Sequence, residues 1–416
     1  MANVSSSNGL EKRPKLRFPG FDEPWNESKL SACFAKNIKK NTDGRISNVI
    51  CNSAKMGLIP QRDYFDKDIA NSDNTSGYYI IEHNDFVYNP RKSSDAPYGP
   101  ISRYACPDAG IVSPLYLCFR AKGDVDTNFF EWYFRSSAWH RYIYMTGDSG
   151  ARHDRVSIKD DDFFSMPIRF PSSIEQKKIA SFLSAIERRI SFQQLLVDNL
   201  KKYKRGVFEA IFSRTLRLMP RTSQSEWTAF KLSDFATRIT RKNNGATDIP
   251  LTISAQYGLI DQRDFFSKVV ASTDMSGYYL LHRGEYAYNR STSNDYPFGS
   301  IKRLDLYDKG AVSTLYLCFA IKEEVVLSDF ARWYFESSQW YRGVNEICAE
   351  GARNHGLLNV PTDGFFNTVH ILPSDIEEQS RIAAFLSRIH EKVIQAQEEL
   401  EELNSLRKGL MQQLFI

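Results

Sequence analysis

The sequence predicts an α+β fold in which two similar β-rich domains are separated by a long antiparallel two-helix coiled coil, with pseudo-twofold symmetry. Two observations predict it: one unit occurs twice along the chain, and each unit ends in a long segment with heptad periodicity. We expect a tail at 1–24, a first domain at 25–171, a helix at 172–213, a linker at 214–226, a second domain at 227–373 and a second helix at 374–416.

The internal repeat recurs at many positions, and corresponding residues lie 200 to 203 positions apart. A period of this length indicates duplicated domains, because solenoid repeats are only about 20–50 residues long. The clearest matches are Ser76-Gly77-Tyr78-Tyr79 with Ser276-Gly277-Tyr278-Tyr279, Leu115–Phe119 with Leu315–Phe319, and Trp132-Tyr133-Phe134 with Trp333-Tyr334-Phe335.

The first part of each unit has turn-forming residues at the spacing typical of a β-rich domain. Gly, Pro, Asn and Asp interrupt it every 8 to 12 residues, and short aromatic and β-branched runs lie between them. This pattern predicts short strands with a few helices, one of them near Phe129–Arg141.

The second part of each unit predicts one long helix. Ser172 with Glu175, and Ser374 with Glu377, match the capping-box pattern at its start. Apolar residues then occur at alternating steps of four and three, interrupted by Lys204 and Arg407 at the same step of each copy. About 40 helical residues span roughly 60 Å, so we expect the two helices to pair with each other. The apolar seam consists of Ile179, Leu183, Ile186, Ile190, Val197, Leu200, Val207 and Ile211, and of Ile382, Leu386, Ile389, Val393, Leu400, Leu403, Leu410 and Leu414.

Composition excludes several classes of protein. Lys and Arg number 54 against 50 Asp and Glu, so an anionic partner needs a local basic patch. No apolar run approaches the ~18 residues of a membrane span, and the start of the chain has no secretory signal. The six cysteines form no CxxC pair and the seven histidines show no ligand spacing. We therefore expect a soluble, cytoplasmic protein with buried free thiols, without metal or cofactor.

Catalytic motifs are also missing. Asn89-Pro90-Arg91 comes nearest to an adenine methyltransferase signature, but its counterpart is Asn289-Arg290-Ser291, without the proline. A nuclease interpretation of Pro107-Asp108 with Glu175 fails in the same way, because the second copy does not repeat it. The sequence predicts a non-catalytic protein.

Polar loops that recur in both copies are the candidate binding sites. They combine amides and guanidinium groups, which contact base edges, with hydroxyls and lysines, which suit phosphates. A solvated loop is the alternative for any single residue, but recurrence of the whole pattern favours DNA binding. The candidates are Lys55, Asn89, Arg91, Lys92, Ser93, Tyr98, Arg103, Arg152, His153 and Arg155 in the first copy, and Gln256, Asn289, Arg290, Tyr296, Lys302, Arg303, Arg353, Asn354 and His355 in the second.

Positions that differ between the copies are the candidates for sequence preference, whereas shared positions more often hold the fold or phosphates. Such differences are Lys55 against Gln256, Ala96 against Tyr296, and His153-Asp154-Arg155 against Asn354-His355-Gly356.

Over nearly its whole length the chain resembles the specificity subunits of Type I restriction-modification enzymes. The resemblance is carried by Leu16–Phe21 before Trp25, the Tyr-Asn loops with their Pro-aromatic-Gly turns, Gly150-Ala151-Arg152 with Gly351-Ala352-Arg353, and the helix entries Ile174–Ile179 and Ile376–Ile382.

This resemblance implies two target-recognition domains that each read one half of a split double-stranded DNA site, with the helices as a ruler for the gap. It also implies two docked methyltransferase subunits, which help to enclose the duplex, and restriction subunits that translocate and cut. The two recognition domains here are unusually alike, so we expect half-sites that are related inverted sequences. A catalytic methyltransferase or nuclease subunit and a coiled-coil adaptor that binds only protein are the alternatives.

Overall fold

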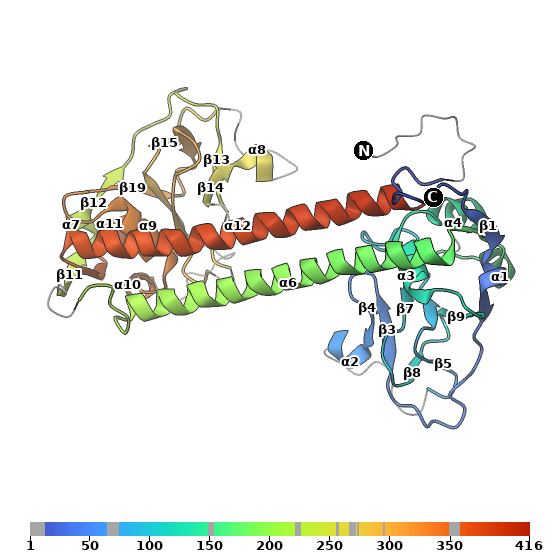
Figure 1. Cartoon of the computed structure of the whole chain (residues 1–416). Coiled ribbons are helices and arrows are strands. Elements are labelled where there is room, and N and C mark those ends of the chain that lie inside the picture. The colour runs from blue at the N-terminus through green and yellow to red at the C-terminus, as the bar shows by residue number, and fades with distance from the viewer. Residues whose placement is uncertain are drawn as a thin grey trace. The chain divides into compact units, whose positions relative to one another are not determined.

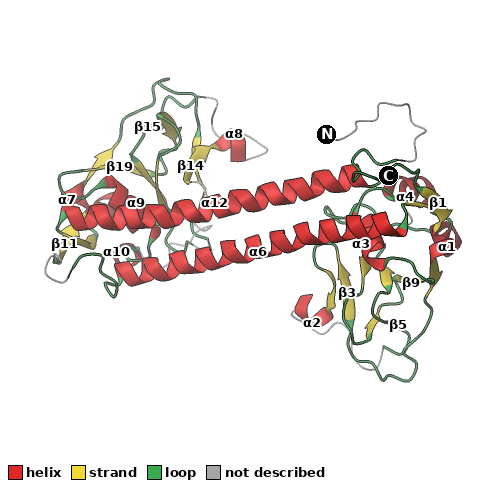
Figure 2. Cartoon of the chain, viewed as in Figure 1, coloured by secondary structure: helices red, strands yellow, loops and turns green. Residues whose placement is uncertain are grey.

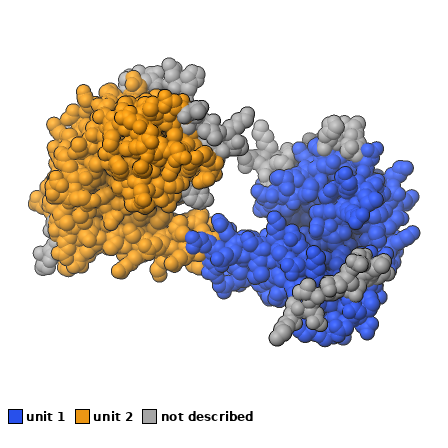
Figure 3. Space-filling model, turned by 90° about the horizontal axis from the view of Figure 1, so that it is seen from above, with its two compact units in different colours: residues 1–194, 398–416 blue, residues 195–397 orange. Residues whose placement is uncertain are grey.

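The computed structural model divides the chain into two compact units, each containing one β-rich domain (Figures 1 and 3). Unit 1 consists of residues 1–194 and 398–416, and unit 2 of residues 195–397. The boundary falls inside both long helices, so it differs from the boundary between the sequence repeats. The structure describes residues 13–64, 75–148, 154–220, 226–254, 258–265, 272, 274–293, 296–348 and 358–416.

The β-rich domain of unit 1 contains short strands joined by long loops (Figure 2). Its strands are β1 (Asn26–Lys29), β2 (Phe34–Lys36), β3 (Ile50–Ser53), β4 (Gly57–Pro60), β5 (Tyr79–Ile81), β6 (Phe86–Tyr88), β7 (Ile101–Arg103), β8 (Gly110–Val112), β9 (Leu117–Ala121) and β10 (Pro167–Phe170). Its helices are α1 (Leu30–Cys33), α2 (Gln61–Tyr64), α3 (Thr127–Arg135), α4 (His140–Thr146) and α5 (Asp160–Phe164), and α6 (Ser173–Phe212) follows.

Unit 2 repeats this order of elements. Its strands are β11 (Trp227–Lys231), β12 (Ala236–Ile239), β13 (Leu251–Ser254), β14 (Gly258–Asp261), β15 (Tyr279–His282), β16 (Tyr286–Asn289), β17 (Ser300–Arg303), β18 (Lys309–Val312), β19 (Leu317–Ile321) and β20 (Val369–Pro373). Its helices are α7 (Leu232–Phe235), α8 (Gln262–Phe265), α9 (Ser328–Glu336), α10 (Tyr341–Ile347) and α11 (Thr362–Phe366), and α12 (Ile376–Leu414) follows.

The strand pairing is the same in both units. A four-stranded antiparallel sheet has the order β2-β9-β6-β7 in unit 1 and β12-β19-β16-β17 in unit 2. Equivalent residues keep the same register, since Phe86 lies opposite Phe119 and Tyr286 lies opposite Phe319. Three two-stranded sheets, β1-β10, β3-β4 and β5-β8, recur as β11-β20, β13-β14 and β15-β18. The duplication predicted from the sequence is therefore a duplication of fold.

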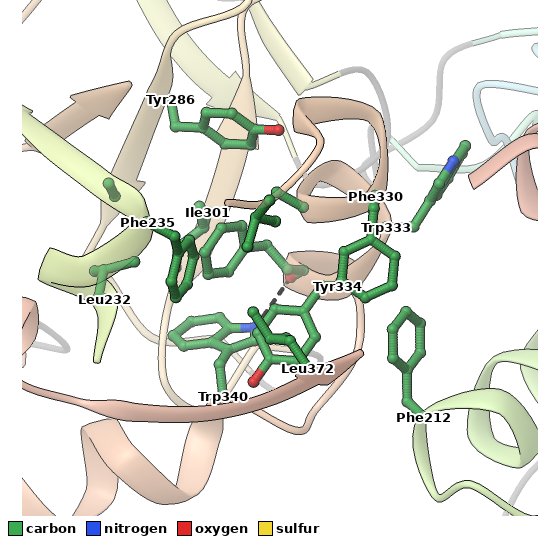
Figure 4. Packing of buried hydrophobic residues seen from close by; sticks show 14 of the residues in the cluster. Phe212, Leu232, Phe235, Tyr286, Ile301, Phe330, Trp333, Tyr334, Trp340 and Leu372 are labelled. Carbon is green, nitrogen blue, oxygen red and sulfur yellow. Dashed lines mark hydrogen bonds between the residues drawn. The ribbon is translucent and has the colours of Figure 1, made fainter. Parts of the chain in front are cut away.

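Aromatic side chains fill the core of each unit. In unit 2, Phe212 of α6 faces Phe330 and Tyr334 of α9, with ring centroids 6.1 and 5.8 Å apart (Figure 4). In unit 1, Trp25 lies 6.0 Å from Phe129 of α3 and 6.5 Å from Phe415. Buried aromatic pairs at these separations contribute about 0.5–1.5 kcal/mol each beyond the burial of apolar area. The ends of both long helices are thus parts of the domain cores.

The predicted antiparallel pairing of α6 with α12 is confirmed. Glu187 accepts a 2.8 Å hydrogen bond from Arg407, and Arg189 pairs with Glu399, so residue numbers fall on α12 as they rise on α6. Every predicted seam position is buried or half-buried. The ends of the seam pack on the domain cores, and the polar contacts between the two helices lie between those ends.

The predicted capping boxes are wrong, because their residues have other partners. The carboxylate of Glu175 accepts two 2.8 Å hydrogen bonds from Arg17 in the segment before β1. At the start of α12, Asp375 accepts the backbone N–H of Glu377 at 2.9 Å, while the hydroxyl of Ser374 donates to the carbonyl of Glu226 at 3.1 Å. A bidentate pair with arginine is stronger than a neutral cap contact, which explains the first difference.

A bidentate ion pair between an arginine and a buried glutamate at the start of a long helix occurs in both units, and we call it the arginine clasp. Arg217, in the segment between α6 and β11, donates two 2.8 Å hydrogen bonds to Glu378 of α12, as Arg17 does to Glu175 of α6. The Glu378 side chain is 0% exposed and that of Glu175 is 1% exposed. In each unit the clasp ties the segment before the domain to the start of a long helix.

The six cysteines are free thiols, as expected, but not all of them are buried. Burial raises the pKa of Cys118 and of Cys318 to about 12, so these two thiols stay protonated at neutral pH. Cys106 is exposed, which corrects the expectation for that residue.

We expect unit 2 to lose stability in acid through His370. Burial lowers the pKa of His370 to about 4, and its ring lies between the hydroxyls of Tyr334 (3.0 Å) and Thr368 (2.8 Å). The unfolded chain takes up this proton below about pH 6.5 and the folded chain only near pH 4, so stability falls across that window, by about 3 kcal/mol at most.

The matched control for His370 comes from the repeat, because unit 1 has Met166 and Ile168 where unit 2 has Thr368 and His370. Thermal unfolding of the wild type and of the double variant Thr368→Met/His370→Ile should diverge between pH 6.5 and 4, with the variant less sensitive. Parallel pH profiles would contradict the assignment.

Candidate nucleic-acid interface

The structure joins the two loops of the first copy that the sequence singles out. Val156 donates its backbone N–H to the carbonyl of Pro90 at 2.9 Å, and Lys92 donates to the carbonyl of Asp154 at 2.8 Å. We call the residues 54–56, 89–100, 113–116 and 154–158 the loop cluster of unit 1. In unit 2 the equivalent bond runs from Leu358 to the carbonyl of Arg290, at 3.0 Å. Among the described residues, segments far apart in sequence are thus joined by backbone hydrogen bonds in each unit.

Asn89 and Asn289 hold the start of the β6–β7 and β16–β17 loops. The Asn89 side-chain oxygen accepts the N–H of Arg91 at 3.0 Å, and Asn289 does the same for Ser291. The Asn89 amide also donates to the carbonyl of Asn52 at 3.0 Å. These contacts within the domain fix the direction of each loop, so the two amides position their neighbours.

The Pro-aromatic-Gly turns anchor the other end of these loops. The buried hydroxyl of Tyr88 donates to the carbonyl of Tyr98 at 2.9 Å, and Tyr288 donates to Phe298 at 2.8 Å. Burial raises the pKa of both tyrosine hydroxyls, which keeps them as donors. The Tyr98 ring lies 5.0 Å from the ring of His140.

Two cations of the loop cluster of unit 1 are exposed and weakly held. The Lys55 side chain is 78% exposed, with its Nζ 3.7 Å from the carboxylate of Asp95. The Arg91 side chain is 68% exposed, with its Nε 3.8 Å from the carboxylate of Asp154. Exposed ion pairs of this length contribute little free energy, about 0–1 kcal/mol each. Both cations can therefore exchange a carboxylate for a phosphate or a base edge at small cost.

Three other predicted cations are tied to carboxylates of their own domain. Arg103 lies 2.6 Å from Glu131 and donates to Asn84, and its side chain is 15% exposed. Lys302, 7% exposed, lies 2.5 Å from Glu336 and 5.5 Å from the ring centroid of Tyr296.

Arg303 repeats this behaviour. It lies 2.6 Å from Asp305 and 2.7 Å from Asp329, with its side chain 12% exposed. The charges of Arg103, Lys302 and Arg303 thus contribute to packing between the four-stranded sheet and the helix that covers it.

The remaining predicted residues differ in accessibility. Ser93 lies in an exposed turn whose backbone hydrogen bonds run to and from Ala96, while Lys92 and Arg155 are half-buried. The guanidinium of Arg290 donates to backbone carbonyls of unit 2. Six predicted residues lie outside the described residues: Arg152, His153, Gln256, Arg353, Asn354 and His355.

Lys36 and Asp160 form an ion pair next to the loop cluster. The sequence alone did not indicate either residue as part of the site. Their counterparts are Arg238 and Thr362, so the difference between the copies was a signal that could have found them. Among the residues that the structure describes, no helix combines the length and hydrophobicity needed to cross a lipid bilayer.

The chain has the fold of the S subunits of Type I restriction-modification systems. Solved structures with this fold include the S subunit from M. genitalium, at a TM-score of 0.56 and 13% identity over 97% of this chain and 99% of that one. The HsdS subunit from Thermoanaerobacter tengcongensis gives 0.51 and 16% over 97% and 98%.

A third similar chain belongs to a structure on complex assembly and conformational transition of the type I R-M system, at 0.55 and 15% over 94% and 97%. No protein-family model and no curated protein sequence matches this chain. The predicted resemblance is thus confirmed at the level of fold along the whole chain.

Proposed function

We propose that this chain is the DNA sequence-specificity subunit of a Type I restriction-modification complex. The observation that carries the proposal is the whole-chain likeness to S subunits, together with the repetition of one scaffold in the two units. Each domain reads one half of a bipartite site, and the paired helices set the distance between the halves. The chain acts in the cytoplasm without catalysis, cofactor or metal of its own.

The partners in this proposal are double-stranded DNA, two methyltransferase subunits and restriction subunits. The net charge of +4 supports a complex in which the methyltransferase subunits also contact the DNA phosphates, since a chain that neutralised many phosphates alone would need a larger excess of cations. The identical strand order and register of the two domains supports half-sites that are related inverted sequences.

Methylome sequencing tests this function. Cells that express the chain with its methyltransferase subunits should methylate a split motif, and the chain alone should methylate nothing. Two unrelated half-sites would overturn the inverted-repeat proposal. Methyl transfer or DNA cleavage by the chain alone would identify a catalytic subunit, and the absence of any motif with active methyltransferase present would identify a protein-only adaptor.

The variant Lys55→Gln/Arg91→Ser places the residues of the second copy on the exposed surface of unit 1. We expect the half-site read by unit 1 to change or to be bound more weakly, while the other half-site stays the same. Because each lost phosphate contact lowers the salt slope of DNA binding by about 1, the slope separates backbone from base contacts. Lys29→Gln, an exposed site on β1, is the control.

A further inference from the structure

A hollow of about 380 Å³ lies within the loop cluster of unit 1, and residues of the cluster form a large part of its lining. Its wall comes from strands β2 and β9, from the loops around them and from the start of α5. The lining residues that matter for its chemistry are Lys36, Pro90, Leu115, Tyr116, Ile158 and Asp160.

In unit 2 an arginine occupies the equivalent place. Arg290 stands where unit 1 has Pro90, and both carbonyls accept the N–H of equivalent residues, Leu358 and Val156. The Arg290 guanidinium donates to the carbonyl of Leu315 at 2.9 Å, and more weakly to that of Val360 at 3.4 Å. Leu315 and Val360 are the counterparts of Leu115 and Ile158 in the wall of the hollow.

The contacts of Arg290 show which group this wall fits. A guanidinium has five donors and no acceptor, so it suits a wall of backbone carbonyls. The Nε of Arg290 is buried without a hydrogen-bond partner among the described residues, and an unmet buried donor costs about 1–3 kcal/mol. The arginine stays in place despite this cost. In unit 1 the equivalent residues Leu115 and Ile158 also line the hollow, but Pro90 has no side-chain donor to bind their carbonyls.

The charges in unit 1 also permit a cation. Lys36 and Asp160 line the hollow and form an ion pair with each other. Their counterparts in unit 2 are Arg238 and Thr362, with Lys36 opposite Phe119 and Arg238 opposite Phe319 in the register. Unit 2 has a cation, Arg238, at the position of Lys36 and no carboxylate at the position of Asp160, yet it holds the guanidinium of Arg290. The charge of Lys36 therefore does not exclude a guanidinium from the hollow of unit 1.

We propose that the hollow of unit 1 binds a guanidinium group from outside the chain, the side chain of an arginine in a partner protein. That arginine takes the place that Arg290 fills in unit 2. Because Arg290 fills this place in unit 2 and Pro90 leaves it open in unit 1, the described residues give one such site, and a partner that docks through it distinguishes unit 1 from unit 2. The hollow is lined by the same loops that we propose to read DNA, but its test is separate from the proposed function, because the binding measurement needs neither DNA nor another subunit.

Equilibrium dialysis of the full chain with radiolabelled agmatine tests the proposal by counting sites. The wild type should bind one agmatine, with a dissociation constant on the order of 1 mM for so small a ligand. Pro90→Arg, which supplies the internal plug, should bind none, and Arg290→Pro, which removes the plug from unit 2, should bind two. Circular dichroism verifies the fold of each variant.

Several outcomes would overturn the proposal. They are no saturable binding to the wild type, unchanged binding to Pro90→Arg, or equal binding of putrescine, which has the same spacer without a guanidinium. If Arg290→Pro does not fold, Pro90→Arg decides alone. A blocked arginine, Nα-acetyl-arginine N-methylamide, should bind as agmatine does, whereas its rejection would limit the site to free small guanidines and overturn the protein partner.

Discussion

Arg217→Met should lower the free energy of unfolding by about 3–5 kcal/mol, because it leaves the carboxylate of Glu378 buried without its cation. The wild-type pair is bidentate, and Glu378 is fully enclosed. In a unit of about 200 residues this loss corresponds to a decrease in Tm of roughly 10 °C. The indole N–H of Trp227 also donates to Glu378, at 3.3 Å, but a neutral donor does not replace a charge.

The matched controls are the equivalent arginine of the other unit, an exposed arginine on α6, and a double variant that also removes Glu378. Arg17→Met should destabilise the chain similarly through Glu175, whereas Arg205→Met, at an exposed position on α6, should change stability by less than about 0.5 kcal/mol. Arg217→Met/Glu378→Met should recover most of the loss, because it removes the buried charge as well. Thermal and urea unfolding measure all four variants. A loss below 1 kcal/mol for Arg217→Met would contradict the burial of this pair.

Gly299→Ala is the second substitution with a large expected effect. Gly299 has φ +77°, where L-residues are strained, and an added Cβ would lie 2.2 Å from the carbonyl oxygen of Asn289. A backbone atom cannot yield as a side chain does, so the loop between β16 and β17 must move. We expect a loss of about 3 kcal/mol or more in stability and weaker binding of one half-site.

Gly277→Ala is the control for Gly299→Ala, since nothing lies within 4 Å of its added Cβ and its φ is not in the left-handed region. The equivalent change in unit 1, Gly99→Ala, meets the carbonyl oxygen of Asn89 at 2.1 Å and should act on the other half-site. Urea unfolding measures stability and methylome sequencing reports the half-sites. Equal behaviour of the alanine variants at 277 and 299 would show that the turn tolerates a side chain.

The fold was predictable because its main signals are linear patterns in the sequence. An offset near 200 reveals the duplication, and a heptad seam reveals each long helix, without knowledge of any contact. The boundary between the two compact units, which falls inside both long helices, was not predictable in the same way. The ends of each seam belong to domain cores, and an apolar stripe alone does not distinguish a helix that packs on a core from one that packs on another helix.

The candidate site was predictable only as far as its loops. The sequence indicates Arg103 and Lys302 as cations near a turn, but their carboxylate partners Glu131 and Glu336 are 28 and 34 residues away. Such pairs depend on how a helix packs on a sheet, and no local pattern records that. The capping boxes failed for the same reason, because Glu175 meets an arginine 158 residues away.

The discontinuity of unit 1 has a consequence for protein synthesis. Leu414 and Phe415 are 2% and 6% exposed in the core that also contains Trp25 and Phe129. All residues of unit 2 leave the ribosome before residues 398–416 do, so unit 2 can complete its core first. Domains commonly fold in the order of their synthesis. Here the core of the domain that is translated first is complete only when the last residues have been translated. A premature stop codon near the end of the gene would therefore remove part of the core of unit 1.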